Sequence, residues 1–339
     1  KENVGAANFT ACPPVRRYYK FGRSDTMKTF SLYVDSAANI PEDIRRARDI
    51  HVIPYHCIVN GEDRLCFDEN VPFEETALAQ YELLRQGVEI KTSLISSAAF
   101  YDALEPEMKA GKDVLLVIIS SGVSGTFKQA TDAAAMLMQD YPDRKVCVVD
   151  SANASMGEGL VALRLADLRD LGESIETCAA WGNDNAFKVN SFFTVDDLKY
   201  LSRSGRISKT VAIAGTILGV KPVLQADGSK NAKITAYTKA RGRKKALAVI
   251  ADTFAQRVER PESQTVAITH ADCLQDAQLL ADMIRERGAK DIIIEYYDLC
   301  TVSHVGPGTL ALFFWGKDRR SAEAATQPQP AGKTVPKNA

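Results

Sequence analysis

Short apolar runs alternate along the chain with longer segments in which apolar residues recur every three or four positions. The runs are typical of buried β-strands, and the longer segments are typical of helices with one buried face. Strands are predicted at 29–34, 52–54, 114–119, 146–149, 191–195, 223–225, 232–236, 266–269, 292–296 and 310–314. Helices are predicted at 41–48, 72–86, 98–110, 127–139, 157–170, 175–183, 195–202, 209–218, 242–258 and 274–287.

This alternation of strands and helices indicates an α/β protein. The first half reads as strand–helix units, which predict a parallel sheet with helices on both faces. The second half contains more strand, including a β-rich stretch at 219–240, and predicts a mixed sheet. We therefore expect two α/β domains, at 27–157 and 158–316, with a ligand site between them.

The two ends depart from this pattern. Residues 1–26 carry several basic residues but lack the apolar core of a signal peptide. We interpret them as a disordered leader of upstream or expression-derived origin, with Met27 as the native start. Residues 317–339 are rich in Pro, Ala and Lys and are expected to form a disordered tail.

The composition narrows the class of function. A hydrophobic fraction of 45% and a formal net charge of −1 are ordinary for a globular protein. They offer no general attraction for nucleic acid or an anionic membrane, so at most transient membrane contact is expected. The basic run Lys239–Lys245 is interpreted as a solvated loop and helix start, with a protein-docking surface as the alternative.

The cysteines and histidines do not form a metal motif. Seven scattered cysteines without a C-x-x-C pair indicate free thiols and a cytoplasmic protein. His51 and His56 flank Pro54 on a short apolar stretch and are expected to be packing or surface residues. No metal site is predicted.

The most informative motif is the Gly/Ser-rich turn Ser120–Thr126, which lies between a predicted buried strand and a predicted helix. Such a turn is expected to leave several backbone N–H groups unpaired at the positive end of the helix dipole. It therefore predicts an anion site. The motif alone does not say which anion binds.

Polar residues also follow other predicted strands. Asp35-Ser36 and Asp150–Ser155 come after two of them, and Lys91–Ser93 with Ser96-Ser97 precede the helix at 98–110. In open α/β sheets, ligands bind beyond the carboxyl ends of the strands. The alternative is that these residues only cap helices, and the two roles are compatible.

Two further residues are candidates from the second half. Arg206 lies beside Gly205 in a turn, from which a guanidinium can bind an oxyanion; the alternative is a solvated surface arginine. His304 lies just before the Gly-Pro-Gly turn at 306–308, where a neutral imidazole can hydrogen-bond a ligand oxygen. The alternative is a buried structural histidine.

Together these segments resemble the DegV family, the bacterial fatty-acid-binding proteins that serve as acyl carriers for fatty acid kinase. The matching segments fall in family order over about residues 29–316. They are Asp35-Ser36, Lys91–Ser93, Ser120–Thr126, Asp150–Ser155, Phe193–Ser208, Arg241–Ala246, Ile268–Asp272 and His304–Gly308.

The resemblance implies a two-domain fold that holds one long-chain fatty acid with its carboxylate near the domain junction. Thr92 and Ser124 correspond to the family's carboxylate-binding residues. Arg206 and His304 correspond to residues tied to the carboxylate network or to phosphoryl transfer by the kinase. The expected supporting residues are Ser93, Ser120, Ser121, Gly125, Thr126 and Gly306.

The same resemblance implies no catalytic residue and no cofactor other than the bound fatty acid, with the kinase as an ATP-binding partner in phospholipid synthesis. Ser204 stands where the family has a second glycine, which leaves Arg203 and Arg206 as alternatives for the kinase-facing arginine. The helix at 211–220 and Phe192 are candidates to line the acyl tail.

Two other classes of function compete with a carrier. A serine hydrolase acting on acyl esters would use Ser124 as nucleophile and His304 as base, with Asp35 or Asp298 as the third residue. A DNA-binding regulator would use the basic run Lys239–Lys245. The chain lacks a P-loop and the protein-kinase motifs, so it does not bind ATP by those modes.

Overall fold

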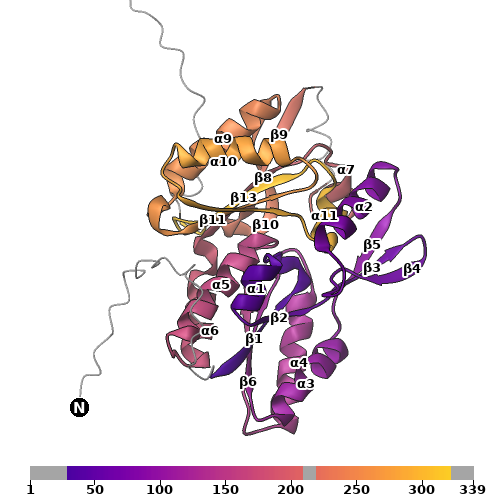
Figure 1. Cartoon of the computed structure of the whole chain (residues 1–339), viewed down its shortest axis with the longest axis vertical. Coiled ribbons are helices and arrows are strands. Elements are labelled where there is room, and N and C mark those ends of the chain that lie inside the picture. The colour runs from indigo at the N-terminus through magenta and orange to yellow at the C-terminus, as the bar shows by residue number, and fades with distance from the viewer. Residues whose placement is uncertain (1–28, 209–218, 322–339) are drawn as a thin grey trace, which may run out of the picture.

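The computed structural model describes residues 29–208 and 219–321. Figure 1 shows most of the first half of the chain below and most of the second half above. The lower part contains a four-stranded sheet of order β2-β1-β6-β7, in which every pairing is parallel. Its strands are β1 (Phe30–Asp35), β2 (Ile50–Ile53), β6 (Asp113–Ile118) and β7 (Val146–Asp150). Its helices are α1 (Glu42–Ala47), α3 (Ser97–Lys109), α4 (Thr126–Asp140) and α6 (Ile175–Asn185).

The upper part contains a six-stranded mixed sheet of order β10-β9-β8-β13-β11-β12. The β11–β12 pair is parallel and the other pairs are antiparallel. The strands are β8 (Val189–Thr194), β9 (Val220–Asp227), β10 (Lys233–Arg241), β11 (Thr265–His270), β12 (Asp291–Tyr296) and β13 (Leu310–Trp315). Helices α9 (Arg243–Arg257) and α10 (Leu274–Arg285) lie over it (Figure 1). The predicted α/β class, with one parallel and one mixed sheet, is confirmed.

Helix α5 (Met156–Asp170) packs against strands of both large sheets and is buried along most of its length. Two glycines permit this close approach. A Cβ on Gly159 would lie 2.6 Å from the Ala38 carbonyl oxygen, and one on Gly157 would lie 2.9 Å from the Phe313 ring. The predicted domain boundary at 157/158 falls within the first turn of this helix and stays a prediction.

A third, three-stranded sheet of order β4-β3-β5 was not predicted. It consists of β3 (His56–Val59), β4 (Glu62–Leu65) and β5 (Ile90–Ser93), and α2 (Phe73–Arg85) lies between β4 and β5 in the chain. All four residues of β4 are exposed, so this strand has no apolar alternation to reveal it.

Two short helices also differ from the prediction. The helix expected at 195–202 is reduced to α7 (Lys199–Arg203). Helix α11 (Leu299–Val305) was not predicted, and it begins where the Asp298 side chain accepts a hydrogen bond from the Thr301 N–H at 2.6 Å. Four 3₁₀ turns complete the described elements: η1 (Ser36–Ala38), η2 (Ala186–Lys188), η3 (Gly228–Lys230) and η4 (Pro261–Ser263).

The chain ends are only partly described. The predicted leader 1–26, the predicted helix 209–218 and residues 322–339 lie outside the described residues. The expected start of a disordered tail at 317 is wrong, because Arg319 is buried and donates to the Ala226 and Ala152 carbonyl oxygens at 2.7 and 2.8 Å.

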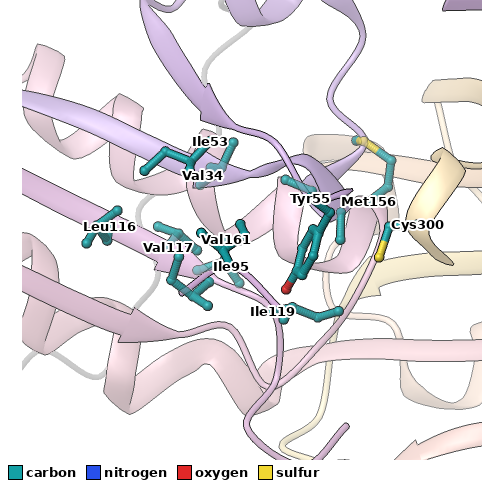
Figure 2. Close-up of a cluster of buried hydrophobic side chains, with 14 of the residues drawn as sticks. Val34, Ile53, Tyr55, Ile95, Leu116, Val117, Ile119, Met156, Val161 and Cys300 are labelled. Atoms are coloured by element: carbon teal, nitrogen blue, oxygen red, sulfur yellow. The ribbon is translucent and has the colours of Figure 1, made fainter. Parts of the chain in front are cut away.

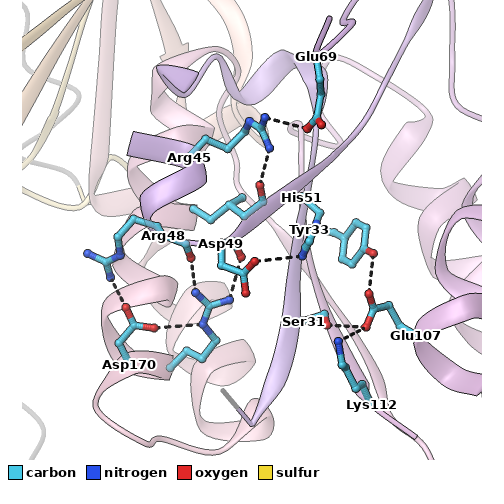
Figure 3. A network of polar contacts seen from close by, with 12 residues as sticks. Ser31, Tyr33, Arg45, Arg48, Asp49, His51, Glu69, Glu107, Lys112 and Asp170 are labelled. Atoms are coloured by element: carbon cyan, nitrogen blue, oxygen red, sulfur yellow. Dashed lines mark hydrogen bonds and ion pairs between the residues drawn. The ribbon is translucent and has the colours of Figure 1, made fainter. Parts of the chain in front are cut away.

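The lower sheet is also held by a polar network around α1 (Figure 3). Arg45 donates to the Ile50 carbonyl oxygen and pairs with Glu69 at 2.8 Å. His51 stacks on Tyr33 at 4.8 Å between ring centroids and lies 3.6 Å from an Asp49 oxygen. His51 is therefore a half-exposed packing residue, as expected.

Candidate functional site

A cavity of about 240 Å³ contains the four predicted ligand residues. Thr92 comes from β5, His304 from α11, Arg206 from the turn after α7, and Ser124 from the loop between β6 and α4. The remaining lining residues are Tyr55, Ser93, Leu94, Ile119, Val123, Gly125, Ala154, Leu201, Ile234, Cys300, Thr301 and Val305. Separate segments of both halves of the chain thus converge on one cavity.

Thr92 and His304 contact each other directly. The Thr92 Oγ1 lies 2.8 Å from the His304 Nε2, so one of the two groups donates to the other. The pair joins the unpredicted β5 to the unpredicted α11. It fixes the Thr92 hydroxyl and one imidazole nitrogen at the wall of the cavity.

The imidazole of His304 is neutral. Burial and, to a smaller extent, the nearby Arg206 and Arg203 guanidinium groups together lower its pKa to about 3. A neutral imidazole provides one donor and one acceptor. The positive charge at this cavity therefore comes from arginine.

Arg206, and not Arg203, lines the cavity. The Arg206 Nη1 donates to the Ser204 carbonyl oxygen at 2.6 Å, which holds the side chain against its own turn. Arg203 is exposed and lies over the Tyr200 ring, with its guanidinium carbon 5.5 Å from the ring centroid. Ser204 has φ −80° and ψ −3°, so this residue fits the turn without strain.

The Gly-Pro-Gly turn fixes the C-terminal end of α11. Gly306 has φ +82°, and a Cβ there would lie 2.3 Å from the Tyr200 ring. A Cβ on Gly308 would lie 2.0 Å from an Asp196 carboxylate oxygen. Only glycine allows this approach, which places the His304 helix against the segment that leads to Arg206.

The Ser120–Thr126 turn differs from the expected open N–H cradle. Six of its backbone N–H groups already donate within the protein, namely those of Ser120, Ser121, Gly122, Val123, Ser124 and Thr126. What the turn offers the cavity is the Ser124 side chain, whose Oγ lies 3.0 Å from the Thr126 Oγ1. The prediction of several unpaired N–H groups is therefore wrong for most of this turn.

Of the supporting residues, Ser93 and Gly125 line the cavity, whereas Ser120, Ser121, Thr126 and Gly306 do not. Ser120 and Ser121 shape the loop: the Ser120 Oγ accepts from the Gly122 N–H, and the Ser121 Oγ accepts from the Asn231 side chain. A Cβ on Gly122 would lie 1.9 Å from the Asn231 carbonyl oxygen, so this glycine lets the loop meet the start of β10.

Most of the other polar residues at strand ends act as caps. The Asp35 carboxylate accepts from the Ala37 and Ile119 N–H groups, both at 2.9 Å. Asp150 accepts from the Ala152 N–H at 2.9 Å, and Ser96 accepts from the Ala99 N–H at 3.1 Å. These side chains therefore act as caps, which was the alternative to ligand binding. By accepting these hydrogen bonds they order the loops around the cavity.

The described residues do not form the triad of a serine hydrolase. His304 Nε2 bonds Thr92, whereas Ser124 bonds Thr126. Asp35 and Asp298 are both buried, and each accepts from backbone N–H groups. A neutral imidazole with a pKa of about 3 is also a poor general base at neutral pH.

A second cavity of about 440 Å³ is lined by Asp35 and Ser36, among other residues. The first turn of α11 contributes Asp298 to this cavity and Cys300 to the first. Phe192 lines neither cavity, because it packs against Tyr237 and Phe314 in the core of the mixed sheet. The other expected tail-lining segment, 211–220, lies almost wholly outside the described residues.

Within residues 29–208 and 219–321, no group of three or more His, Cys, Asp or Glu side chains is arranged to hold a metal ion. No helix in the described part of the chain combines the length and the apolar character needed to cross a bilayer.

The basic run Lys239–Lys245 ends β10 and begins α9, and its Arg243 pairs with Asp276 at 2.8 Å.

A family profile described as "Uncharacterised protein, DegV family" matches residues 29–317. The chain belongs to the DegV family. A DegV domain-containing protein of Clostridium perfringens is 37% identical over 291 residues, which cover 86% of this chain and 98% of that relative.

Solved structures of the DegV family share this fold. One, described as the fatty acid binding of a DegV family protein from Thermus thermophilus, matches with a TM-score of 0.74 at 27% identity over 85% of this chain and 100% of that chain. DegV from Bacillus subtilis, described as a fatty acid binding protein, matches with a TM-score of 0.72 at 26% identity over 86% of this chain and 100% of that chain. The arrangement of these sheets is therefore the DegV fold.

Proposed function

We propose that this DegV-family protein binds one long-chain fatty acid, with the carboxylate held by Thr92 and Ser124 beside Arg206 and His304. The observation that carries the proposal is that these four side chains, from four segments far apart in the sequence, line one cavity. The relatives from Thermus thermophilus and Bacillus subtilis, both described as fatty acid binding, support the choice of ligand.

The chemistry of the cavity suits a carboxylate on an alkyl chain. Two hydroxyl groups and one guanidinium donate to an anion, and charge-assisted hydrogen bonds of this kind are strong. Because His304 is neutral, the one negative charge of the carboxylate is balanced by one arginine that lines the cavity, Arg206. The walls also include apolar side chains, among them Leu94, Val123, Leu201, Ile234 and Val305. Each buried methylene contributes about 0.8 kcal/mol, so a long chain supplies most of the affinity.

The second part of the proposal is that the protein presents the bound carboxylate to an ATP-dependent fatty acid kinase in phospholipid synthesis. A carboxylate oxygen would attack the γ-phosphorus of ATP, and the bond to the leaving ADP would break to give an acyl phosphate. Arg206 at the cavity and the exposed Arg203 beside it are suited to stabilise that charge. The six cysteines in the described residues are free thiols, which accords with a cytoplasmic location.

The test uses the delipidated protein and octadecanoate. We expect saturable binding of one octadecanoate per chain, weakened in Thr92→Val and Ser124→Ala. Adding ATP and a bacterial fatty acid kinase should then yield an acyl phosphate, which hydroxylamine traps as a hydroxamate. Absence of octadecanoate binding would refute the carrier function, whereas binding without hydroxamate would refute only the kinase partnership.

A further inference from the structure

The second cavity has no part in the proposed fatty-acid site. The two cavities share no lining residue. Val34 at the wall of the second cavity and Tyr55 and Cys300 at the wall of the first belong to one cluster of buried side chains (Figure 2). Packed side chains therefore separate the two spaces. With about 440 Å³, the second cavity is in the size range of small-molecule sites.

Three parts of the chain form the walls of this second cavity. One wall comes from residues 34–45, between the end of β1 and α1, and another from residues 66–74, between β4 and the start of α2. The third comes from the ends of β11 and β12 and from the start of α10. The lining side chains of Val71 and Leu274 are each 44% exposed, so the cavity is open to solvent beside them.

The charge of the lining is strongly negative. Its acidic residues are Asp35, Glu42, Asp68, Glu74, Glu295 and Asp298. Within the described residues only Glu42 of this set forms an ion pair, with Arg46. Arg45 also lines the cavity, but its guanidinium already pairs with Glu69 at 2.8 Å, and burial lowers the pKa of His270, which keeps that ring neutral. The cavity therefore attracts a cation and disfavours an anion.

Two buried oxygens at the end of β12 lack a hydrogen-bond donor. The Asp298 Oδ1 accepts from the Thr301 N–H at 2.6 Å, whereas its Oδ2 has no partner among the described residues. The Asn39 Nδ2 donates to the Tyr296 carbonyl oxygen at 2.7 Å, and its Oδ1 likewise has none. Asp298 is 2% and Asn39 9% exposed, and both line the cavity. Since unpaired buried acceptors are costly, a ligand with N–H donors would stabilise them.

The rest of the lining suits an apolar body. Phe67, Phe73 and Tyr296 contribute aromatic rings, and Val52 and Ile294 contribute aliphatic side chains. Aromatic rings pack against an apolar group and also attract a cation at their faces. The described residues offer no group of side chains arranged for a metal ion, so the cation that fits this cavity is organic.

We propose that the second cavity binds a primary organic amine as its ammonium ion, with the N–H groups donating to Asp298 and Asn39 and the apolar body against the aromatic rings. A primary ammonium supplies the donors that a quaternary ammonium lacks. The site does not depend on the proposed fatty-acid function, because the two cavities are separate.

The experiment is isothermal titration of the full chain at pH 8 with tryptamine, a primary amine on an indole ring. Burial raises the pKa of Asp298 to about 7, so most of this carboxyl group is ionised at pH 8. Tryptophol carries a hydroxyl and indole-3-propionate a carboxylate in place of the ammonium. We expect one tryptamine per chain with a Kd of about 1 mM or lower, tryptophol at least tenfold weaker, and no binding of indole-3-propionate.

Two variants locate the amine. Asp298→Asn and Glu295→Gln each remove a charge and keep the shape, and each should raise the Kd for tryptamine about fivefold to tenfold. Asp143→Asn, at an exposed turn outside the cavity, should keep the wild-type Kd. If Asp298→Asn does not fold by circular dichroism, Glu295→Gln decides the question.

Three results would overturn the inference: no saturable binding of tryptamine, equal affinity for tryptophol, or the wild-type Kd in the folded cavity variants. Saturating octadecanoate, added before the titration, should leave the Kd for tryptamine unchanged. Competition between the two ligands would also overturn the inference, because it would place the amine in the fatty-acid site.

Discussion

Thr92 and His304 are 212 residues apart in the sequence, yet the Thr92 Oγ1 lies 2.8 Å from the His304 Nε2. Thr92 is on β5, where it pairs with Cys57 of β3, and His304 is in the last turn of α11. One hydrogen bond thus ties the three-stranded sheet to the segment that follows the mixed sheet's β12. Both groups lie at the cavity proposed for the carboxylate.

The first prediction concerns the Thr92 hydroxyl. Thr92→Val keeps the shape of the side chain but removes a donor to the carboxylate and the partner of His304. We expect the Kd for octadecanoate to rise about tenfold, which is typical of losing one hydrogen bond to a charged group. Thr131→Val is the control, because Thr131 is exposed on α4 and bonds only its own helix at the Phe127 carbonyl oxygen. Equal affinities in the two variants would argue against a carboxylate at Thr92.

The second prediction separates the two arginines. Arg206 lines the cavity, whereas Arg203 packs over the Tyr200 ring. Arg206→Gln should therefore weaken octadecanoate binding about tenfold or more, and Arg203→Gln should change it less than twofold. Titration of both variants against the same fluorescent fatty acid measures this. A larger effect at Arg203 would reverse the assignment.

The third prediction concerns the turn after His304. Gly306→Ala places a methyl group 2.3 Å from the Tyr200 ring at a φ of +82°. Gly172→Ala is the matched control, because Gly172 has φ +88° and nothing within 4 Å of its added Cβ. Both variants should lose about 1 kcal/mol from backbone strain. Only Gly306→Ala should lose further stability and fatty-acid affinity, as thermal unfolding and titration would reveal. Equal losses would show that the approach to Tyr200 is unimportant.

The fourth prediction concerns the pH dependence of stability. Burial raises the pKa of Asp298 to about 7, above the value of about 4 in an unfolded chain. Its contribution to stability is therefore fully present below about pH 4 and is lost as the pH rises through 7. Asp298→Asn removes the charge and keeps an acceptor for the Thr301 N–H, which Asp298 binds at 2.6 Å.

We measure the difference in the free energy of unfolding between Asp298→Asn and the wild type at each pH. From pH 5 to pH 8 this difference should shift by roughly 2–4 kcal/mol in favour of Asp298→Asn. Asp143→Asn, at an exposed turn, is the control for the Asp-to-Asn exchange itself. A stability difference for Asp298→Asn that stays constant over this range would contradict an Asp298 that titrates near pH 7.

Much of the fold was predictable because its long elements have strong periodic patterns. Every strand of the two large sheets overlaps its predicted range, although β10 extends five residues beyond it, and helices such as α4 and α10 lie within two residues of their predicted bounds. Gly87, Gly111, Gly172 and Gly288, which follow predicted helices, all adopt positive φ. These local signals do not depend on the rest of the chain.

The elements that carry Thr92 and His304 were not predictable in the same way. β5 is four residues long and mostly polar, and it is a strand because β3 pairs with it. Helix α11 has only seven residues and is fixed by the Asp298 cap and by packing against Tyr200. Tertiary contacts determine the secondary structure of such short segments. The four site residues were therefore predicted from their resemblance to family motifs, whereas a neighbour such as Tyr55 was not predicted.

Native mass spectrometry of the purified protein tests the central claim most directly. After delipidation and reloading with octadecanoate, the account predicts a single added mass of one octadecanoate per chain, and that species should be strongly reduced in a Thr92→Val/Ser124→Ala double variant. Absence of the one-to-one species in the wild type, or its full retention in the double variant, would contradict a fatty-acid carboxylate held at Thr92 and Ser124.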